Sequence, residues 1–266
     1  MPHLRSALAT KLGPTGFYLA RRIVTLLRYY GGIIYDRDLL FVRQLAAQPL
    51  LIDVGANAGQ SALCMAMLRT DARIISFEAN ARNVRDLAFV RRILGDRYSY
   101  HHIGLSDRNG SATLHVPVVG RTPVPGESSF LSQFDSSTED RIGRITSVAA
   151  QRVGLRTLDS FELRPAFVKI DVQGHELEVL RGMAATLVVC RPVLLLERGF
   201  QFPDICEYLR TLDYVLCQYD RASGELIPCA RPEGINYFAA PHEHHALAGR
   251  DVRTTNSQAV LSQGGA

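Results

Sequence analysis

The chain has 266 residues, 47% of them hydrophobic, and a formal net charge of +4 at pH 7. This length suits one α/β domain with some additional segments and is enough to bury a sizeable core. The charge is far below that of a strongly basic nucleic-acid binder, so we expect no nucleic-acid partner.

The N-terminal segment, residues 1–48, is predicted to form a helical cap. Residues 1–16 contain Gly13 and Pro14 and indicate a loose start, whereas residues 17–30 carry apolar side chains at helical spacing. We favour packing of this helix over the sheet. Its arginines and tyrosines also suit a peripheral contact with a membrane surface, which stays open as the alternative.

Residues 49–241 alternate short apolar runs with helical stretches. The predicted strands are 50–54, 73–77, 98–105, 111–116, 167–172, 193–197, 214–219 and 235–240. The predicted helices are 60–68, 80–94, 174–187 and 203–212. This alternation predicts a Rossmann-like α/β fold, with a mostly parallel seven-stranded sheet, a closing antiparallel strand and helices on both faces. Ligands of such sheets bind at the carboxyl ends of the strands.

Two segments depart from this rhythm. Residues 117–150 are rich in proline and serine and are predicted to form a lid-like insertion over an acceptor, with a flexible surface loop as an equal alternative. Phe130, Phe134 and Arg141 within it suit a sugar ring or an anionic group. Residues 242–266 are polar and are predicted to be a disordered tail.

The sharpest motif is LIDVGANAGQS at residues 51–61. Asp53 ends an apolar strand, and Gly55, Asn57 and Gly59 then lead into a helix. Glycines permit a tight turn against a ligand, and asparagine tolerates left-handed geometry better than most residues. A carboxylate before the glycines repels a pyrophosphate and attracts a cationic ligand, which favours S-adenosylmethionine over a dinucleotide.

A second acidic residue, Glu78 in ISFEAN, ends the next predicted strand. An acid at this position can accept hydrogen bonds from both ribose hydroxyls of an adenosyl group. The alternative is a surface acid that caps the following helix. We favour the ribose role, because Asp53 and Glu78 fall on the same edge of the sheet.

These two motifs, together with GLSDRNG (104–110), VKIDVQGHELEVLRGM (168–183) and LLLE (194–197), resemble the FkbM family of methyltransferases. The resemblance covers about residues 50–200 and implies a class I methyltransferase fold over residues 49–241. It also implies methyl transfer from S-adenosylmethionine, usually to oxygen, and here to a hydroxyl of a sugar in a glycolipid or polysaccharide.

The resemblance also assigns roles to single residues. Asp53, Gly55, Asn57 and Gly59 then line the methionine end of the cofactor, and Glu78 holds the ribose. Ser106 lies near the adenine, and Asp171 lies between cofactor and acceptor. Many members of the family have glutamate where this chain has Gln173, which removes one negative charge and weakens any metal or base role there.

An aliphatic hydroxyl is a weak nucleophile, so a positioned base assists methyl transfer. Candidate catalytic residues are Asp171, His175 and Glu197, and Glu176 is a further acid in the first turn of a predicted helix. His175 has a helix-capping alternative, and Asp171 a hydrogen-bonding role in the core.

No spacing rule requires a metal, so transfer without a metal is the default. Asp171, Glu176 and Glu197 together suit Mg²⁺ as an alternative. His101 and His102 point to opposite faces of one predicted strand, and His242, His244 and His245 fall in the predicted tail, so neither group indicates a metal site.

Two other functions stay open. A nicotinamide-dependent oxidoreductase uses a similar sheet, but Asp53 and the absence of GxGxxG disfavour it. A non-catalytic binding protein with the cofactor fold is the other, since a fold alone does not fix function. The spacing of the five cysteines and the absence of a targeting or membrane-spanning segment predict a cytoplasmic protein, with the inner face of the membrane as an alternative.

Overall fold

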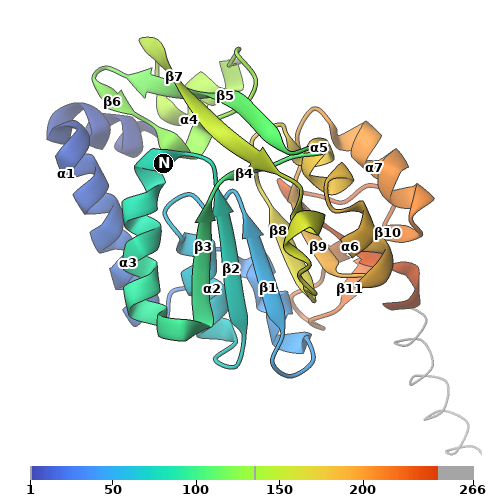
Figure 1. The fold of residues 1–266 in the computed structure, drawn as a ribbon. Coiled ribbons are helices and arrows are strands. Elements are labelled where there is room, and N and C mark those ends of the chain that lie inside the picture. Colours follow the sequence, from blue (N-terminus) through green and yellow to red (C-terminus); the bar gives the residue numbers. More distant parts are fainter. Residues whose placement is uncertain (1, 135, 245–266) are drawn as a thin grey trace, which may run out of the picture.

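A computed structural model of the protein describes residues 2–134 and 136–244, and its centre is a mixed sheet of eight strands (Figure 1). The strands are β1 (Leu50–Val54), β2 (Arg73–Glu78), β3 (Tyr98–His102), β8 (Phe167–Ile170), β9 (Val193–Glu197), β10 (Tyr214–Tyr219), β11 (Leu226–Pro228) and β12 (Asn236–Pro241). Their order is β11-β10-β12-β9-β8-β1-β2-β3. Within this order, the five strands β9, β8, β1, β2 and β3 are parallel to one another. Strand β12 is antiparallel to both β9 and β10. This confirms the predicted Rossmann-like fold of class I methyltransferases.

Helices cover both faces of this sheet. One face packs against η1 (Arg37–Gln44), α2 (Gln60–Leu68) and α3 (Val84–Leu94), through a core that includes Phe41 and Phe167. The other face packs against α5 (Glu176–Arg181), α6 (Ala184–Val189) and α7 (Phe202–Thr211), through a core that includes Phe77 and Leu180. The central strands are mostly apolar on both sides, as expected for buried parallel strands, and Asp53, Ser76 and Lys169 are exceptions. Short 3-10 turns complete this part: η2 (Ala81–Asn83), η3 (Gly95–Arg97) and η5 (Leu158–Phe161).

A second, four-stranded sheet lies across the end of the main sheet at which β1, β2 and β3 terminate (Figure 1). Its strands are β4 (Gly104–Leu105), β5 (Gly110–Val119), β6 (Thr122–Pro123) and β7 (Ser147–Arg156), in the order β4-β7-β5-β6. Between β6 and β7 lie η4 (Pro125–Glu127) and α4 (Ser136–Ile142). The predicted insertion 117–150 is therefore only partly a loop. Its end belongs to β7, which pairs with β5 along nine residues of register.

Three predicted elements are wrong in detail. The strand predicted for 98–105 divides, because the chain leaves β2 after His102 and pairs with β7 at Gly104. The helix predicted for 174–187 breaks into α5 and α6 at Gly182, where a side chain would come within 1.9 Å of the carbonyl oxygen of Ser106. The sheet has eight strands rather than seven, because a turn at Asp220–Gly224 returns the chain as the short edge strand β11.

The N-terminal helix α1 (Pro2–Tyr30) is longer than the predicted 17–30, because a further helical segment precedes the predicted one and joins it across a non-helical kink at Gly13. Its inner face packs on the rest of the protein. Arg21 and Arg22 both form ion pairs with the buried Asp86 of α3, and the Tyr18 hydroxyl lies 3.4 Å from the carbonyl oxygen of Pro123. The favoured prediction is a helix packed over the sheet; this face contacts α3, which itself covers the sheet, and the segment around Pro123.

Within residues 2–134 and 136–244, no helix combines the length and apolarity needed to cross a membrane. At the C-terminal end, residues 242–244 continue as a helical turn after β12, and the His244 ring lies 6.2 Å from that of Phe41. The rest of the predicted tail, including His245, falls outside the described residues.

Candidate active site

A cleft of about 560 Å³ opens at the carboxyl ends of β1, β2 and β8, beneath the second sheet. Its polar lining comes from Asn57, Glu78, Ser128, Asp171 and Gln173. Its apolar lining includes Leu105, Leu114 and Phe130. The size is typical of a site for a small organic ligand, and the position is the switch point where strand order reverses between β1 and β8. We refer to it as the cofactor cleft.

The glycine turn after β1 forms one wall of the cofactor cleft. Gly55 has a φ of +78°, and a side chain there would come within 1.8 Å of the Asp171 carbonyl oxygen, so only glycine fits. Asn57 has the left-handed φ of +50° that the sequence indicated, and its side chain accepts a hydrogen bond from Arg21. Gly59 does not line the cleft. It begins α2 and faces Val90 of α3, so the predicted contact with the cofactor is not seen.

Glu78 lies at the base of the cofactor cleft, with only 7% of its surface exposed. Its two carboxylate oxygens accept hydrogen bonds from the backbone N–H groups of Asn57, at 2.6 Å, and Asn80, at 2.7 Å. Burial raises the pKa of Glu78 to about 7, although these N–H donors oppose the shift. Each oxygen retains a further lone pair, so the carboxylate can also accept hydrogen bonds from ligand hydroxyls.

Asp53 is fully buried and does not line the cleft, contrary to the sequence prediction. It is the penultimate residue of β1, and its side chain points into the sheet face shared with Ser76 and Lys169. One carboxylate oxygen lies 3.4 Å from the Ser76 hydroxyl, and the other has no hydrogen-bond partner. Burial raises the pKa of Asp53 to about 6, with the Lys169 ammonium acting in the opposite direction.

Lys169, which the sequence analysis did not identify, is the buried cation of this region. Its ammonium group donates a hydrogen bond to Asp171 at 2.9 Å, and its side chain is 8% exposed. Burial opposes the charge, but the carboxylates of Asp171 and Asp53 raise the pKa of Lys169. The sequence does contain a signal for this residue, because Lys169 is the one charged residue in an apolar strand. A buried charge requires a partner, so an acid was to be expected nearby.

Asp171 and Glu197 form a carboxyl pair in which each group shifts the pKa of the other. Gln173 links them as well, because its side-chain amide donates to Asp171 at 3.0 Å and to Glu197 at 2.7 Å. Burial favours neutral carboxyls, yet Lys169 lowers the pKa of Asp171. Burial, and then the negative charge of Asp171, raise the pKa of Glu197. The arrangement therefore holds one ionised and one readily protonated carboxyl side by side.

A second cleft, of about 1030 Å³, adjoins the first and shares Gln173 with it. We refer to it as the acceptor cleft. The residues that line it include two acids, Glu176 and Glu197, and side chains from the lid and from the chain after β9: Phe134, Arg141, Arg198 and Phe200. The lid residues Phe134 and Arg141 thus face this cleft, whereas Phe130 lines the cofactor cleft.

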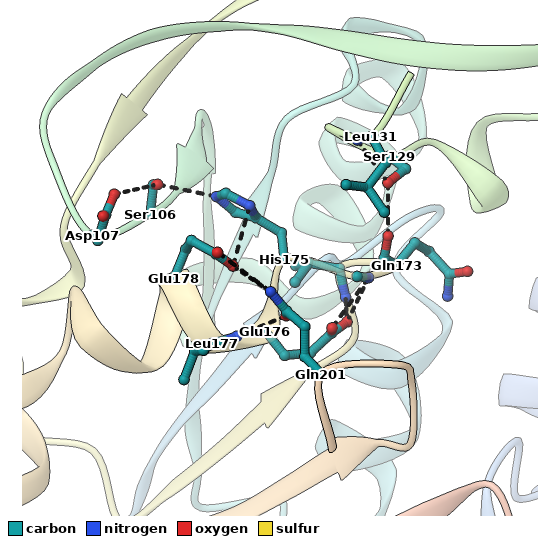
Figure 2. A network of polar contacts seen from close by, with 12 residues as sticks. Ser106, Asp107, Ser129, Leu131, Gln173, His175, Glu176, Leu177, Glu178 and Gln201 are labelled. Atoms are coloured by element: carbon teal, nitrogen blue, oxygen red, sulfur yellow. Dashed lines mark hydrogen bonds and ion pairs between the residues drawn. The ribbon is translucent and has the colours of Figure 1, made fainter. Parts of the chain in front are cut away.

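His175 lines neither cleft, which argues against its predicted catalytic role. Figure 2 shows its ring within a network of protein contacts. Its Nε2 atom lies 3.0 Å from the Ser106 hydroxyl, its Nδ1 atom lies 3.5 Å from Glu178, and its ring packs on Phe130 at 4.7 Å. Burial lowers the pKa of His175. Since both ring nitrogens contact protein groups, this residue supports the turn before α5.

The same network accounts for two further predicted residues. Ser106 is buried, and its hydroxyl lies beside His175 rather than in the cofactor cleft. Its backbone N–H donates to the carbonyl oxygen of Arg156, where β4 runs alongside β7 in the second sheet. Leu105 lines the cleft in its place. Glu176 lines the acceptor cleft, but its carboxylate already accepts hydrogen bonds from the N–H groups of Val172 and Gly174.

The described residues offer no evident set of ligands for a metal ion. Among the described residues, no cluster of three or more histidines, cysteines or acids suits a metal ion. The side-chain N–H group of Gln173 lies between the carboxylates of Asp171 and Glu197 and donates a hydrogen bond to each. A metal ion at that position would need an oxygen ligand instead of this N–H donor.

One family profile identifies the class of domain. The profile of the family described as "Methyltransferase FkbM domain" matches residues 53–216. No curated protein matches the chain.

Three solved structures illustrate the structural likeness. Methyltransferase FkbM from Methylobacillus flagellatus KT is 17% identical with a TM-score of 0.48, and the match covers 73% of this chain but only 43% of that one. Precorrin-6y C5,15-methyltransferase from Geobacter metallireducens GS-15 is 13% identical with a TM-score of 0.41, over 76% of this chain and 85% of that one. A SAM-dependent O-methyltransferase from Thermotoga maritima is 11% identical with a TM-score of 0.40, over 79% and 66% of the two chains.

Proposed function

Because the chain belongs to the FkbM methyltransferase family, we propose that it transfers a methyl group from S-adenosylmethionine to a hydroxyl of a sugar, in a glycolipid or a polysaccharide. The observation that carries this proposal is the junction of two clefts at Gln173, where the carboxyl pair Asp171 and Glu197 lies. A donor in one cleft and an acceptor in the other would meet at that pair.

The residues of the cofactor cleft fit S-adenosylmethionine. The carboxylate of Glu78 suits the ribose hydroxyls, and the apolar side chains Leu105, Leu114 and Phe130 suit the adenine ring. The ionised Asp171 and the close turn at Gly55 suit the positively charged methionine end. When bound, the cofactor supplies an electrophilic methyl group on a sulfonium.

Glu197 is the base that we propose for the acceptor hydroxyl. It lines the acceptor cleft, and its raised pKa places it closer to the working pH than an ordinary glutamate, as general-base catalysis requires. As the new carbon–oxygen bond forms, the hydroxyl proton passes to the Glu197 carboxylate. Asp171, which Lys169 keeps ionised, contributes negative charge near the sulfonium, and Gln173 orients both carboxyl groups.

The side chains of the acceptor cleft support a sugar as the acceptor. Phe134 and Phe200 offer rings on which the apolar face of a sugar can stack. Arg141 and Arg198 offer hydrogen-bond donors for hydroxyl or acidic groups. The volume of about 1030 Å³ and its open form suit an acceptor that belongs to a larger glycan or lipid.

Two measurements test the proposal. Transfer of label from methyl-labelled S-adenosylmethionine to a panel of glycolipids and polysaccharides should occur with the native chain. It should fall about 100-fold or more in Glu197→Gln with cofactor affinity unchanged. Glu207→Gln, an exposed acid on α7, is the matched control and should keep full activity. An equally active Glu197→Gln would remove the assigned base.

The other open functions predict different results. An oxidoreductase would bind NAD in calorimetry and show no affinity for S-adenosylmethionine. A non-catalytic binding protein would bind S-adenosylmethionine without transfer to any acceptor. Either outcome would contradict the proposed reaction.

A further inference from the structure

Between residues 18 and 30, the exposed side chains of α1 are all apolar. Leu19, Ile23, Leu27 and Tyr30 recur at helical spacing, and we refer to them as the apolar stripe. Leu27 is 65% exposed and Tyr30 is 73% exposed. A contiguous patch of this kind on a soluble surface marks a site of interaction rather than an ordinary scatter of apolar residues.

The stripe lies opposite the face that packs on the protein. The inner side of α1 holds Arg21 and Arg22 against Asp86, while the stripe lies on the other side of the helix, which runs along the outside of the molecule (Figure 1). The exposed apolar surface continues past the helix with Ile33 and Tyr35. The packed face therefore anchors α1, and the stripe stays available to a partner.

The positive charge of the N-terminal segment indicates the kind of partner that the stripe would bind. The first 35 residues contain five lysines and arginines and no aspartate or glutamate, and the first acid is Asp36. Two of these cations, Arg21 and Arg22, share the single acid Asp86, so the segment keeps an excess of positive charge. An apolar helix face with basic surroundings is typical of helices that lie in the interface of an anionic bilayer. A second copy of this chain would bring the same basic segment into contact with itself, and the like charges would repel.

We propose that the apolar stripe of α1 docks the protein on the surface of an anionic lipid bilayer. The helix lies in the interface and does not cross the membrane. Because Tyr18 and Arg21 of the same helix contact Pro123 of the lid region and Asn57 of the glycine turn, docking holds both clefts near the lipid surface. This placement fits the lipid-linked form of the proposed acceptor, but the docking itself does not depend on methyl transfer.

Sedimentation of the full chain with vesicles tests the proposal. The native chain should bind vesicles of phosphatidylcholine and phosphatidylglycerol, bind vesicles of phosphatidylcholine alone more weakly, and release as salt rises. The double variant Leu19→Ser/Leu27→Ser should lower the partition onto anionic vesicles about tenfold or more. Val188→Ser/Val189→Ser, an exposed apolar pair on α6, is the control and should bind as the native chain does.

Circular dichroism and calorimetry with S-adenosylmethionine verify that each variant is folded. Absence of native binding to anionic vesicles would overturn the proposal, as would an equal loss in the α6 control. If the native chain is instead a dimer in ultracentrifugation and the stripe variant is a monomer, the stripe binds a second copy and the proposal is wrong. Methyl transfer is measured separately with a soluble acceptor, so a failure of docking and a failure of the proposed reaction are distinguishable.

Discussion

Replacing the buried Asp53 by asparagine should stabilise the protein at alkaline pH. The carboxylate has no exposed surface and one oxygen without a partner, so its ionised form is disfavoured in the fold. Its pKa is raised from 3.8 to about 6, so the folded state binds more protons than the unfolded state between these values. The free energy of unfolding therefore decreases as the pH rises through this window.

The size of this effect follows from the pKa. A tenfold change in a protonation equilibrium corresponds to about 1.4 kcal/mol, so the ionised Asp53 costs about 3 kcal/mol above the window. That cost already includes the attraction of Lys169, and asparagine still buries a polar amide, so we expect a net gain of about 1–2 kcal/mol. Below the window the carboxyl is neutral in both states, and the gain should vanish.

Urea unfolding of native and Asp53→Asn protein at about pH 4 and about pH 8 measures this difference. Asp204→Asn, an exposed residue of α7, is the control and should change stability by less than about 0.5 kcal/mol at either pH. An Asp53→Asn variant that is less stable than the native protein at about pH 8 would refute the reasoning. Asp53 would then be stabilised by Lys169 more than it is destabilised by burial.

Three further predictions concern the junction of the clefts. The acid limb of the pH dependence of kcat/KM should lie well above the ordinary pKa of glutamate, because burial and Asp171 raise the pKa of Glu197; a limb near the ordinary value would exclude Glu197 as the base. Lys169→Met should destabilise the fold by about 1–3 kcal/mol in urea unfolding, because it leaves the partly exposed Asp171 without its buried cation, and an unchanged stability would contradict the ion pair. Gly55→Ala should lower both the melting temperature and the affinity for S-adenosylmethionine in calorimetry, because its methyl group would overlap the Asp171 backbone; native behaviour would show that the turn is looser than described.

The sheet and the cofactor turn could be predicted from sequence because their signals are local. Buried strands appear as apolar runs, and Asp53 and Glu78 end two of them at one edge. The left-handed backbone at Asn57 followed from the residue type and was correct. Family resemblance supplied Asp171, and the end of the next predicted strand supplied Glu197; Gln173 contacts both across β8 and β9.

The errors concern interactions between distant segments. Strand β7 has an exposed, weakly alternating sequence, and its pairing with β5 and β4 makes it a strand. Asp53 was expected in the cleft, but the alternation of side chains along β1 turns it into the sheet toward Lys169. His175 follows β8 directly, yet its ring turns back to Ser106 and Glu178, two partners that sequence spacing does not reveal.

The most direct test of the central claim is a crystal structure of the full chain with S-adenosylhomocysteine. We expect the ribose hydroxyls within hydrogen-bond distance of the Glu78 carboxylate, and the sulfur beside Gln173 at the entrance to the acceptor cleft. Density for the ligand elsewhere, or an empty cofactor cleft at saturating concentration, would contradict the account.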